Sequence, residues 1–385
     1  MKNGKYEKKN EGMDVNAKPK KKVKVWLIVL LVIVGLALAA VLTVYGIFHN
    51  KYAQIYEPET TPPITETVPG ATTMPEPDYE EIVDADEEQV KEMEEATEDL
   101  EEMESVEATQ EVIWDDNVYN ILLLGTDERS KDGSYKAAAR SDTCMLLSIN
   151  LSGDHPVISL ISFERGMGVP ILEGRYEGEW DWLTHTFRYG GASLITREIR
   201  ECFKVDVDHY VRVNFEMFKK GVDALGGVTV DVDSAEAAYL RSAGFNIKKG
   251  VQELNGKEAL CYARIRKIDS DWVRIRRQRE VVQSAMEKLG QMPLDKMLAM
   301  VDELLPLVKT NIPEDKMAEL ILLLPRLKDA EFQQMTIPKK GTYGSKKGMG
   351  GRSMYSADFD KNAQIIHEFL YPQNFPDKVP EETQP

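Results

Sequence analysis

One long apolar run lies near the start of the chain. Residues 25–48 carry no charged side chain and consist mainly of Leu, Ile, Val, Ala and Gly. About 20 apolar residues in a helix cross a ~30 Å hydrocarbon core, so this run predicts a transmembrane helix. A cleaved signal peptide is the alternative, because Ala37, Ala39 and Ala40 resemble a cleavage site. Signal peptides usually carry only ~7–15 apolar residues, however, which favours the uncleaved anchor.

Shorter apolar runs bounded by Gly, Asp and Pro begin after residue 112, and they are typical of a packed domain. Strands are predicted at 119–125, 143–150, 156–163, 208–215, 228–233 and 262–266. Helices are predicted at 216–225, 272–289, 294–308 and 314–327. This mixed order predicts an α/β fold, a three-layer α-β-α domain in which helices cover both faces of a central mixed sheet.

The polar stretches divide the rest of the chain. Residues 1–24 hold nine Lys against three acidic residues, and the Lys crowd the start of the apolar run. The positive-inside rule therefore places the N-terminus in the cytoplasm and the later residues outside. Residues 51–112 hold 21 acidic residues against two Lys, and residues 56–73 within them are rich in Pro and Thr. The acidic run 87–108 could be helical by propensity. It lacks an apolar stripe wide enough to bury, so a disordered, self-repelling linker is the prediction.

The predicted organisation follows from these zones. It comprises a basic cytoplasmic tail (1–24), a transmembrane helix (25–48), a disordered Pro/Thr and acidic linker (49–112), an extracellular domain (113–375) and a disordered tail (376–385).

Net charge and cysteines add little to the functional picture. The net charge of −17 comes mostly from the linker, which leaves about −4 for residues 113–385 and indicates no nucleic-acid partner. Cys144, Cys202 and Cys261 form no CxxC pair. They are predicted to be small buried hydrophobic residues, with Cys144 and Cys261 in strands.

Ionised residues stand at the ends of several apolar runs, where loops meet the predicted sheet. Each Arg taken alone is most simply a solvated charge or a surface ion pair. Together, many Arg with two Asp favour a phosphate site, because a guanidinium group matches phosphate oxygens two at a time. The residues are Asp127, Arg129, Arg140, Asp142, Arg165, Arg264, Arg266, Arg274, Arg277, Gln278 and Arg279.

The spacing within two of these motifs predicts which side chains face one another. In a strand, Arg264 and Arg266 would point to one face because side chains repeat every two residues. In a helix, Arg274, Arg277 and Gln278 would share a face, because they are three and four residues apart.

Residues 120–289 resemble the LytR-CpsA-Psr domain. The matching strings are NILLLGTDER, RSDTCMLLSIN, HTFRYGG, DHYVRVNFEMFKKGVDALGGVTVDV, LNGKEALCYARIR and RIRRQREVV, with a weaker match in MGGRSMYSADFDKNAQIIHEFLY. The resemblance implies a membrane-anchored phosphotransferase of the Gram-positive type of cell wall. Such an enzyme passes the phosphate-linked glycan of a polyprenyl-pyrophosphate donor, such as teichoic acid or capsule, to peptidoglycan.

The resemblance also implies roles for individual residues. Asp127 and Asp142 correspond to the carboxylates beside Mg2+, with Mn2+ as an alternative ion. Arg140 and Arg165 correspond to catalytic arginines. The implied pyrophosphate-binding residues are Arg264, Arg266, Arg274 and Gln278, with Arg129, Arg277 and Arg279 as neighbours. The family's lipid slot would lie between the sheet and its covering helices.

Two motifs depart from the family pattern. Family members commonly read Ile-Pro-Arg-Asp where this chain reads Phe163-Glu164-Arg165-Gly166. The Arg is kept, but the carboxylate that follows it is missing. Near HTFRYGG, Trp182 and Thr184 replace the usual Lys and Asn, while His185 is kept and is expected to be structural.

Three functional classes therefore remain. An active transferase is the main prediction. The alternative is a catalytically weakened paralogue that binds polyprenyl phosphates or regulates envelope assembly. The third class is a structural envelope protein whose Arg residues only form ion pairs.

Overall fold

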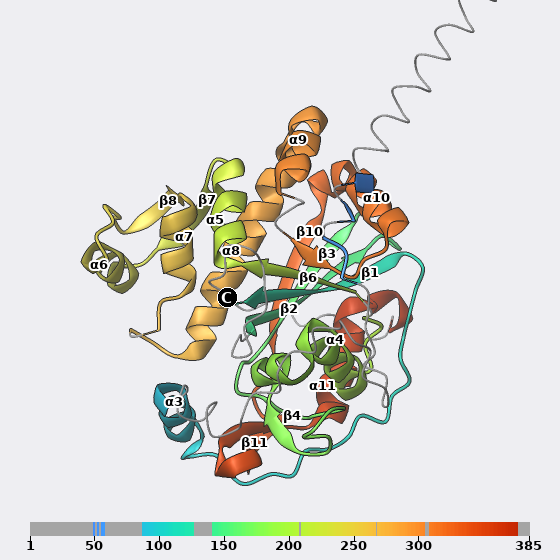
Figure 1. The fold of residues 1–385 in the computed structure, drawn as a ribbon, viewed down its shortest axis with the longest axis vertical. Coiled ribbons are helices and arrows are strands. Elements are labelled where there is room, and N and C mark those ends of the chain that lie inside the picture. Colours follow the sequence, from blue (N-terminus) through green and yellow to red (C-terminus); the bar gives the residue numbers. More distant parts are fainter. Residues whose placement is uncertain are drawn as a thin grey trace, which may run out of the picture. The chain divides into compact units, whose positions relative to one another are not determined.

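The centre of the fold is a mixed six-stranded sheet (Figure 1). The computed structural model describes residues 49–50, 52–53, 55–57, 87–126, 141–207, 209–266, 268–304 and 308–375. The strand order is β10 (Glu331–Ile337), β3 (Val157–Phe163), β2 (Ser141–Asn150), β1 (Val118–Thr126), β6 (His209–Asn214) and β9 (Lys309–Thr310). The β1–β6 and β3–β10 pairs are parallel, whereas β1–β2, β2–β3 and β6–β9 are antiparallel. The predicted α/β fold and its first four strands are confirmed.

Helices cover both faces of this sheet because its strands alternate apolar side chains between the faces. On one face, Leu122, Leu124 and Leu146 pack with α4 (Leu183–Phe203) and α11 (Phe359–Leu370) in one buried core. On the other face, Leu147 and Leu160 pack with residues of α8 (Asp271–Gln291) and η2 (Leu324–Asp329). Figure 1 shows α4 and α11 on one side of the sheet and α8 on the other.

A second apolar core lies beside α8. It joins α5 (Phe215–Ala224), β7 (Val228–Val232), α6 (Ser234–Ser242), β8 (Gly250–Leu254) and α7 (Gly256–Ala263). The predicted strand at 228–233 is β7, which pairs with β8 in a separate hairpin. The remaining elements are α9 (Leu294–Leu304), α10 (Glu314–Leu323), β4 (Gly168–Pro170), β5 (Trp180–Trp182), β11 (Tyr343–Lys347), η3 (Met349–Gly351), β12 (Ser353–Ala357) and η4 (Pro372–Asn374).

The strand predicted at 262–266 is wrong. Asn255 and Glu258 form a capping box that starts helix α7, and this helix runs to Ala263. Arg264 caps the C-terminus of α7, so Arg264 and Arg266 lie in irregular backbone. Cys261 is accordingly a partly buried helical residue, whereas Cys144 is buried in a strand and Cys202 is buried in a helix, α4.

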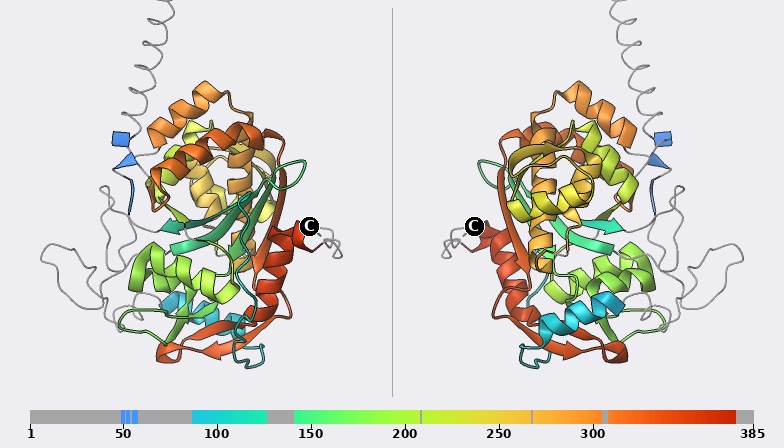
Figure 2. Two further views of the ribbon diagram at one scale, coloured as in Figure 1. Left: turned by 90° about the vertical axis from the view of Figure 1, so that its right-hand side faces the viewer. Right: turned by 90° about the vertical axis from the view of Figure 1, so that its left-hand side faces the viewer.

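Part of the predicted disordered linker is also folded. Residues Glu87–Thr97 form helix α3, whose Met93 is buried against Trp182, Met354 and Tyr355. Figure 2 shows α3 in cyan beside the red β11–β12 hairpin. The next residues continue along that hairpin, since the Met103 amide donates to the Ser345 carbonyl at 2.9 Å.

The acidic side chains of this segment have basic partners far along the chain. Glu94 lies 3.8 Å from the Lys347 ammonium and Glu104 2.7 Å from the Lys346 ammonium. Self-repulsion is therefore relieved by residues about 250 positions away, which the local composition does not reveal. Nearer the N-terminus, Ile55 is fully buried and the Glu57 amide donates to the Thr310 carbonyl at 2.8 Å.

The predicted transmembrane helix at 25–48 lies outside the described residues. Within the described ranges, no helix is both long and apolar enough to cross a membrane.

Candidate functional site

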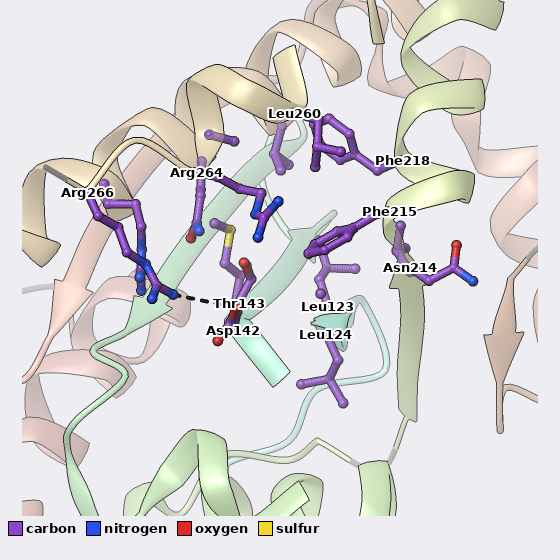
Figure 3. Close-up of a pocket in the computed structure, with 17 residues that line it drawn as sticks. Leu123, Leu124, Asp142, Thr143, Asn214, Phe215, Phe218, Leu260, Arg264 and Arg266 are labelled. Atoms are coloured by element: carbon purple, nitrogen blue, oxygen red, sulfur yellow. Dashed lines mark ion pairs between the residues drawn. The ribbon is translucent and has the colours of Figure 1, made fainter. Parts of the chain in front are cut away.

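A pocket of about 180 Å3 opens between the sheet and the helices α5, α7 and α8 (Figure 3). Its apolar part is lined by Leu123, Leu124, Met145, Val213, Phe215, Phe218, Leu260, Ala263 and Val282. Its polar part is lined by Asp142, Thr143, Asn214, Arg264, Arg266, Arg274 and Gln278. Figure 3 shows Arg266 and Asp142 at one side of the pocket and Leu260, Phe218 and Phe215 at the other. Such a pocket suits a ligand with an anionic group and an apolar chain.

Strand β2 and the loop after α7 position the first charged pair. Asp142 lies near the start of β2, and its Oδ2 is 3.5 Å from Nη2 of Arg266. Burial, reinforced by the charges of Arg274 and Arg165, lowers the pKa of Arg266 to about 10. The cations therefore repel one another, and an anionic ligand would relieve that repulsion.

Arg264 is exposed and lies over the ring of Phe215, with its guanidinium carbon 4.4 Å from the ring centroid. This cation–π contact holds the side chain at the boundary between the apolar and the polar parts of the pocket.

Helix α8 begins with Asp271, which binds Arg274 one turn later. Nη1 of Arg274 lies 2.9 Å from Oδ1 of Asp271, and Nη2 donates to Oδ2 at 3.0 Å. This two-point contact fixes the plane of the guanidinium group. The Arg274 side chain is only 2% exposed, and its Nε has no hydrogen-bond partner among the described residues.

Arg165 lies behind the pocket lining and is joined to it through Asp271. Its Nη2 is 3.9 Å from Oδ1 of Asp271 and 3.4 Å from Oε2 of Glu92 in α3. Its side chain is 2% exposed, yet Nε and Nη1 find no hydrogen-bond partner in the described ranges. Buried donors of this kind are costly and indicate a place for an anion.

Two carboxyl groups of this cluster were not predicted as site residues. Asp271 had a sequence signal, because it stands three residues before Arg274 at the start of a helix. Glu164 was visible only as a departure from the family pattern. The structure places it fully buried beside Arg165 and close enough to Asp271 for the two carboxyl groups to interact electrostatically.

The structure does not bring every predicted residue into the pocket. Arg277 is buried on the other side of α8, where it pairs with Glu236 and Asp269. Arg279 donates to Gln334 at 2.9 Å and also to Thr336, both on β10. The prediction that Arg277 shares a helical face with Arg274 is therefore wrong. Arg277 lies three residues after Arg274 but packs into the second core.

Three predicted site residues, Asp127, Arg129 and Arg140, lie outside the described residues. Within the part of the chain that the structure describes, no cluster of three or more His, Cys, Asp or Glu forms a metal-binding group. Asp142 alone therefore represents the predicted metal-side carboxylates here.

His185 lies in a buried network away from the pocket lining. Burial lowers its pKa to about 4, so the imidazole is neutral at pH 7. Its Nδ1 is 3.4 Å from Asp181 and 2.5 Å from Arg352. These contacts support the structural role expected for this residue.

Gly166 packs directly against helix α3. A Cβ atom there would lie 1.9 Å from Cε of Met93 and 3.3 Å from Oε2 of Glu164. Gly166→Asp is therefore expected to displace Met93 and to lower the free energy of unfolding by about 1–3 kcal/mol, as overpacking does. Urea denaturation measures this, with Gly153→Asp at an exposed glycine as the control. A smaller loss in the Met93→Ala background would identify the clash, and wild-type stability of the single variant would contradict it.

The fold and the site together define an α/β domain with an arginine-rich, apolar-walled pocket. The chain belongs to the LytR_cpsA_psr family, whose model matches residues 82–369.

Similar proteins carry related names. Over 211 residues the chain is 36% identical to a polyisoprenyl-teichoic acid–peptidoglycan teichoic acid transferase TagU of Oceanobacillus iheyensis, and the match covers 52% of this chain and 61% of that relative. Over 225 residues it is 32% identical to the corresponding TagT of Bacillus subtilis, which covers 57% and 67%. The chain thus spans less than two thirds of the TagU relative.

Solved structures of similar fold include TagT bound to LIIa-WTA. That structure is 26% identical with a TM-score of 0.53, and the match covers 70% of this chain and 96% of that chain. Another is a LytR-CPS2A-psr family protein, YwtF (TagT), with bound octaprenyl pyrophosphate lipid, at 22% identity, a TM-score of 0.51 and coverage of 70% and 98%. The second likeness supports the fold alone.

Proposed function

We propose that this protein is a membrane-anchored phosphotransferase that attaches polyprenyl-pyrophosphate-linked glycans to peptidoglycan. The observation that carries the proposal is the pocket, where an apolar wall of Leu and Phe meets three arginines and a carboxylate. A polyprenyl pyrophosphate has the same division into an apolar chain and a doubly charged head. The names of the TagU and TagT relatives support teichoic acid as the glycan, with capsule or another wall polymer as alternatives.

The pocket residues have distinct parts in this proposal. Arg264, Arg266 and Arg274 neutralise the pyrophosphate oxygens, and Gln278 donates to them from the same helix as Arg274. Phosphoryl transfer depends mainly on positioning and charge stabilisation, which such a cluster supplies. The apolar lining holds the first isoprene units and excludes water from the reacting phosphate.

The metal ion in the proposal is Mg2+, or Mn2+ in its place. Asp142 fits this role because Mg2+ binds through one or two carboxylates together with substrate phosphates. When bound, the ion would neutralise developing charge on the phosphate oxygens. Asp127 is the second proposed ligand, and Arg140 is proposed to assist Arg165 as a catalytic arginine.

The proposed reaction forms one P–O bond and breaks another. A sugar hydroxyl of peptidoglycan attacks the phosphorus that carries the glycan, and the bond from this phosphorus to the bridging oxygen breaks. Polyprenyl phosphate leaves with the bonding electron pair, and the hydroxyl proton passes to Asp127 or Asp142.

The location is part of the same proposal. Residues 25–48 anchor the chain in the plasma membrane, residues 1–24 face the cytoplasm, and the folded domain acts outside the cell. The apolar run and the Lys that precede it support this arrangement.

The test is cleavage of a polyprenyl-pyrophosphate-linked glycan by the full chain in detergent, with Mg2+ and with EDTA. We expect polyprenyl phosphate to appear only with the metal, and turnover to be lost in Asp142→Ala. Metal-independent turnover would remove Mg2+ from the proposal. Absence of turnover and of binding would refute the function as a whole.

The second candidate is a paralogue that binds polyprenyl phosphates without turnover. Two observations favour it. Glu92 of helix α3 contacts Arg165. Gly166 also stands where the family motif carries a carboxylate. Binding of the donor without product, at saturating Mg2+, would identify this alternative.

A further inference from the structure

A pair of carboxyl groups lies behind the pocket arginines. Glu164 is 0% exposed, and the Asp271 side chain is 18% exposed. The two carboxyl groups lie close enough for each to shift the pKa of the other. Oε2 of Glu164 accepts the Gly166 amide proton at 2.6 Å, which fixes the carboxyl group on its own loop. Its Oε1 accepts no hydrogen bond from any described residue.

The pair contacts two arginines at once. Both oxygens of Asp271 bind the Arg274 guanidinium group, at 2.9 Å and 3.0 Å. The same carboxylate lies 3.9 Å from Nη2 of Arg165. Arg274 lines the pocket, whereas Arg165 reaches it only through this carboxylate. Asp271 therefore contacts both guanidinium groups.

The charge of the pair follows from its surroundings. Burial, followed by the nearby Asp271, raises the pKa of Glu164, which favours the protonated form of its carboxyl group. Burial alone would raise the pKa of Asp271, but Arg274 and Arg165 outweigh it and lower that pKa. The ionised Asp271 then lies against both Arg165 and Arg274, and Glu92 adds a second carboxylate beside Arg165.

We propose that Glu164 and Asp271 are positioning residues for the anion site. In this arrangement the Glu164 carboxyl group donates a hydrogen bond to Asp271, and Asp271 holds Arg165 and Arg274 in the orientation that binds pyrophosphate. The inference rests on the proposed function, since it names what orients the arginines of that same site.

Two substitutions at Glu164 separate positioning from proton transfer. Glutamine keeps an oxygen for the Gly166 amide and an N–H donor for Asp271, but it does not exchange a proton in catalysis. Leucine has a similar size and provides neither hydrogen bond. Positioning therefore requires that Glu164→Gln is tolerated and Glu164→Leu is not.

The experiment measures the binding of inorganic pyrophosphate to the full chain in detergent by titration calorimetry. We expect Glu164→Gln to bind within about twofold of wild type. Glu164→Leu and Asp271→Asn should bind about tenfold more weakly or worse, as expected when a hydrogen bond to a charged group is lost. Glu198→Leu removes another fully buried carboxyl group, in α4, and should leave the affinity unchanged.

Each outcome decides the inference. Wild-type affinity in Glu164→Leu overturns it, and so does a loss in Glu164→Gln as large as in Glu164→Leu. If Glu164→Leu does not fold, Asp271→Asn decides alone: weakened binding supports positioning and wild-type affinity refutes it. Failure of the wild-type chain to bind pyrophosphate overturns the proposed function and, with it, this inference. Normal wild-type binding with unchanged affinity in Glu164→Leu overturns this inference alone.

Discussion

Replacing Arg274 with alanine is expected to lower the rate of polyprenyl-pyrophosphate cleavage by about 100- to 1,000-fold, the usual loss when one preorganised charge is removed from an active site. Arg274 is buried, faces the pocket and is held by both oxygens of Asp271. Its plane is therefore set before the substrate arrives. Removal also leaves Asp271 with a negative charge that only Arg165 and Arg266 offset, which disfavours a second anion.

Two further variants test whether the loss of rate comes from the guanidinium group of Arg274. Arg274→Lys keeps the charge but loses the planar fork, so we expect a smaller loss, of about tenfold. Arg276→Ala is the matched control, because Arg276 stands two residues along α8, pairs with Glu280 at 2.5 Å and does not line the pocket. Steady-state rates at saturating Mg2+ measure all three. An equal loss in Arg276→Ala would show that the effect comes from helix stability rather than from the site.

Arg352→Ala is expected to lower the free energy of unfolding by about 3–5 kcal/mol, because it removes one partner of a buried ion pair. Nη1 of Arg352 lies 2.7 Å from Oδ1 of Asp181, and the Tyr189 hydroxyl donates to Oδ2 of the same carboxylate at 2.7 Å. Both charged side chains are buried under Trp182. Without Arg352, the Asp181 charge is left in a low-dielectric interior.

The same network predicts how this loss depends on pH. Burial alone would raise the pKa of Asp181, but His185, Arg352 and Tyr189 outweigh it and hold that pKa well below its usual range. Stability from a lowered carboxyl pKa is present above the unfolded value, about 3.9, and is lost as the pH falls below it. The difference between wild type and Arg352→Ala should therefore stay constant from pH 7 to about pH 4 and shrink as the pH falls below about 4, toward the lowered pKa of Asp181.

Urea unfolding at several pH values measures this difference. Lys361→Ala is the control, since Lys361 pairs with Asp358 on the surface and should contribute less than about 1 kcal/mol. A constant difference across the pH range would show that Arg352 stabilises the domain by packing on Trp182 and not through the Asp181 charge.

The central sheet was predictable because its strands are nearly continuous apolar runs with β-branched residues. The strands at 119–125, 143–150 and 156–163 each place apolar side chains in a core on both faces of the sheet. Because both faces are buried, these strands are apolar along nearly their whole length. The run at 262–266 also has a strand-like pattern, but a capping box that begins seven residues earlier, at Asn255, starts a helix that includes Tyr262 and Ala263. Local helix initiation outweighed a short strand-like pattern.

The candidate site was predictable in its residue types and less so in its partners. Arginine motifs identified Arg264, Arg266 and Arg274, because each follows from a short string. Asp271 and Glu164 interact although they lie about 107 residues apart in the chain. The spacing of residues within a short motif does not predict such a contact. Arg277 shows the opposite case, in which a charged residue of the same motif belongs to an internal ion-pair network.

Helix α3 was missed for a related reason. Five of its 11 residues are Glu against one Lys, and an isolated helix of that composition would repel itself. Lys347 and Arg165 supply the opposite charges for Glu94 and Glu92, and Met93 supplies the apolar contact.

The docking of residues 55–57 on β9 and of α3 beside β12 assigns both stretches to the folded unit. The predicted spacer in front of the domain is therefore shortened to the residues that precede residue 55. Sequence changes in these two stretches accordingly affect the packing of the domain rather than its reach.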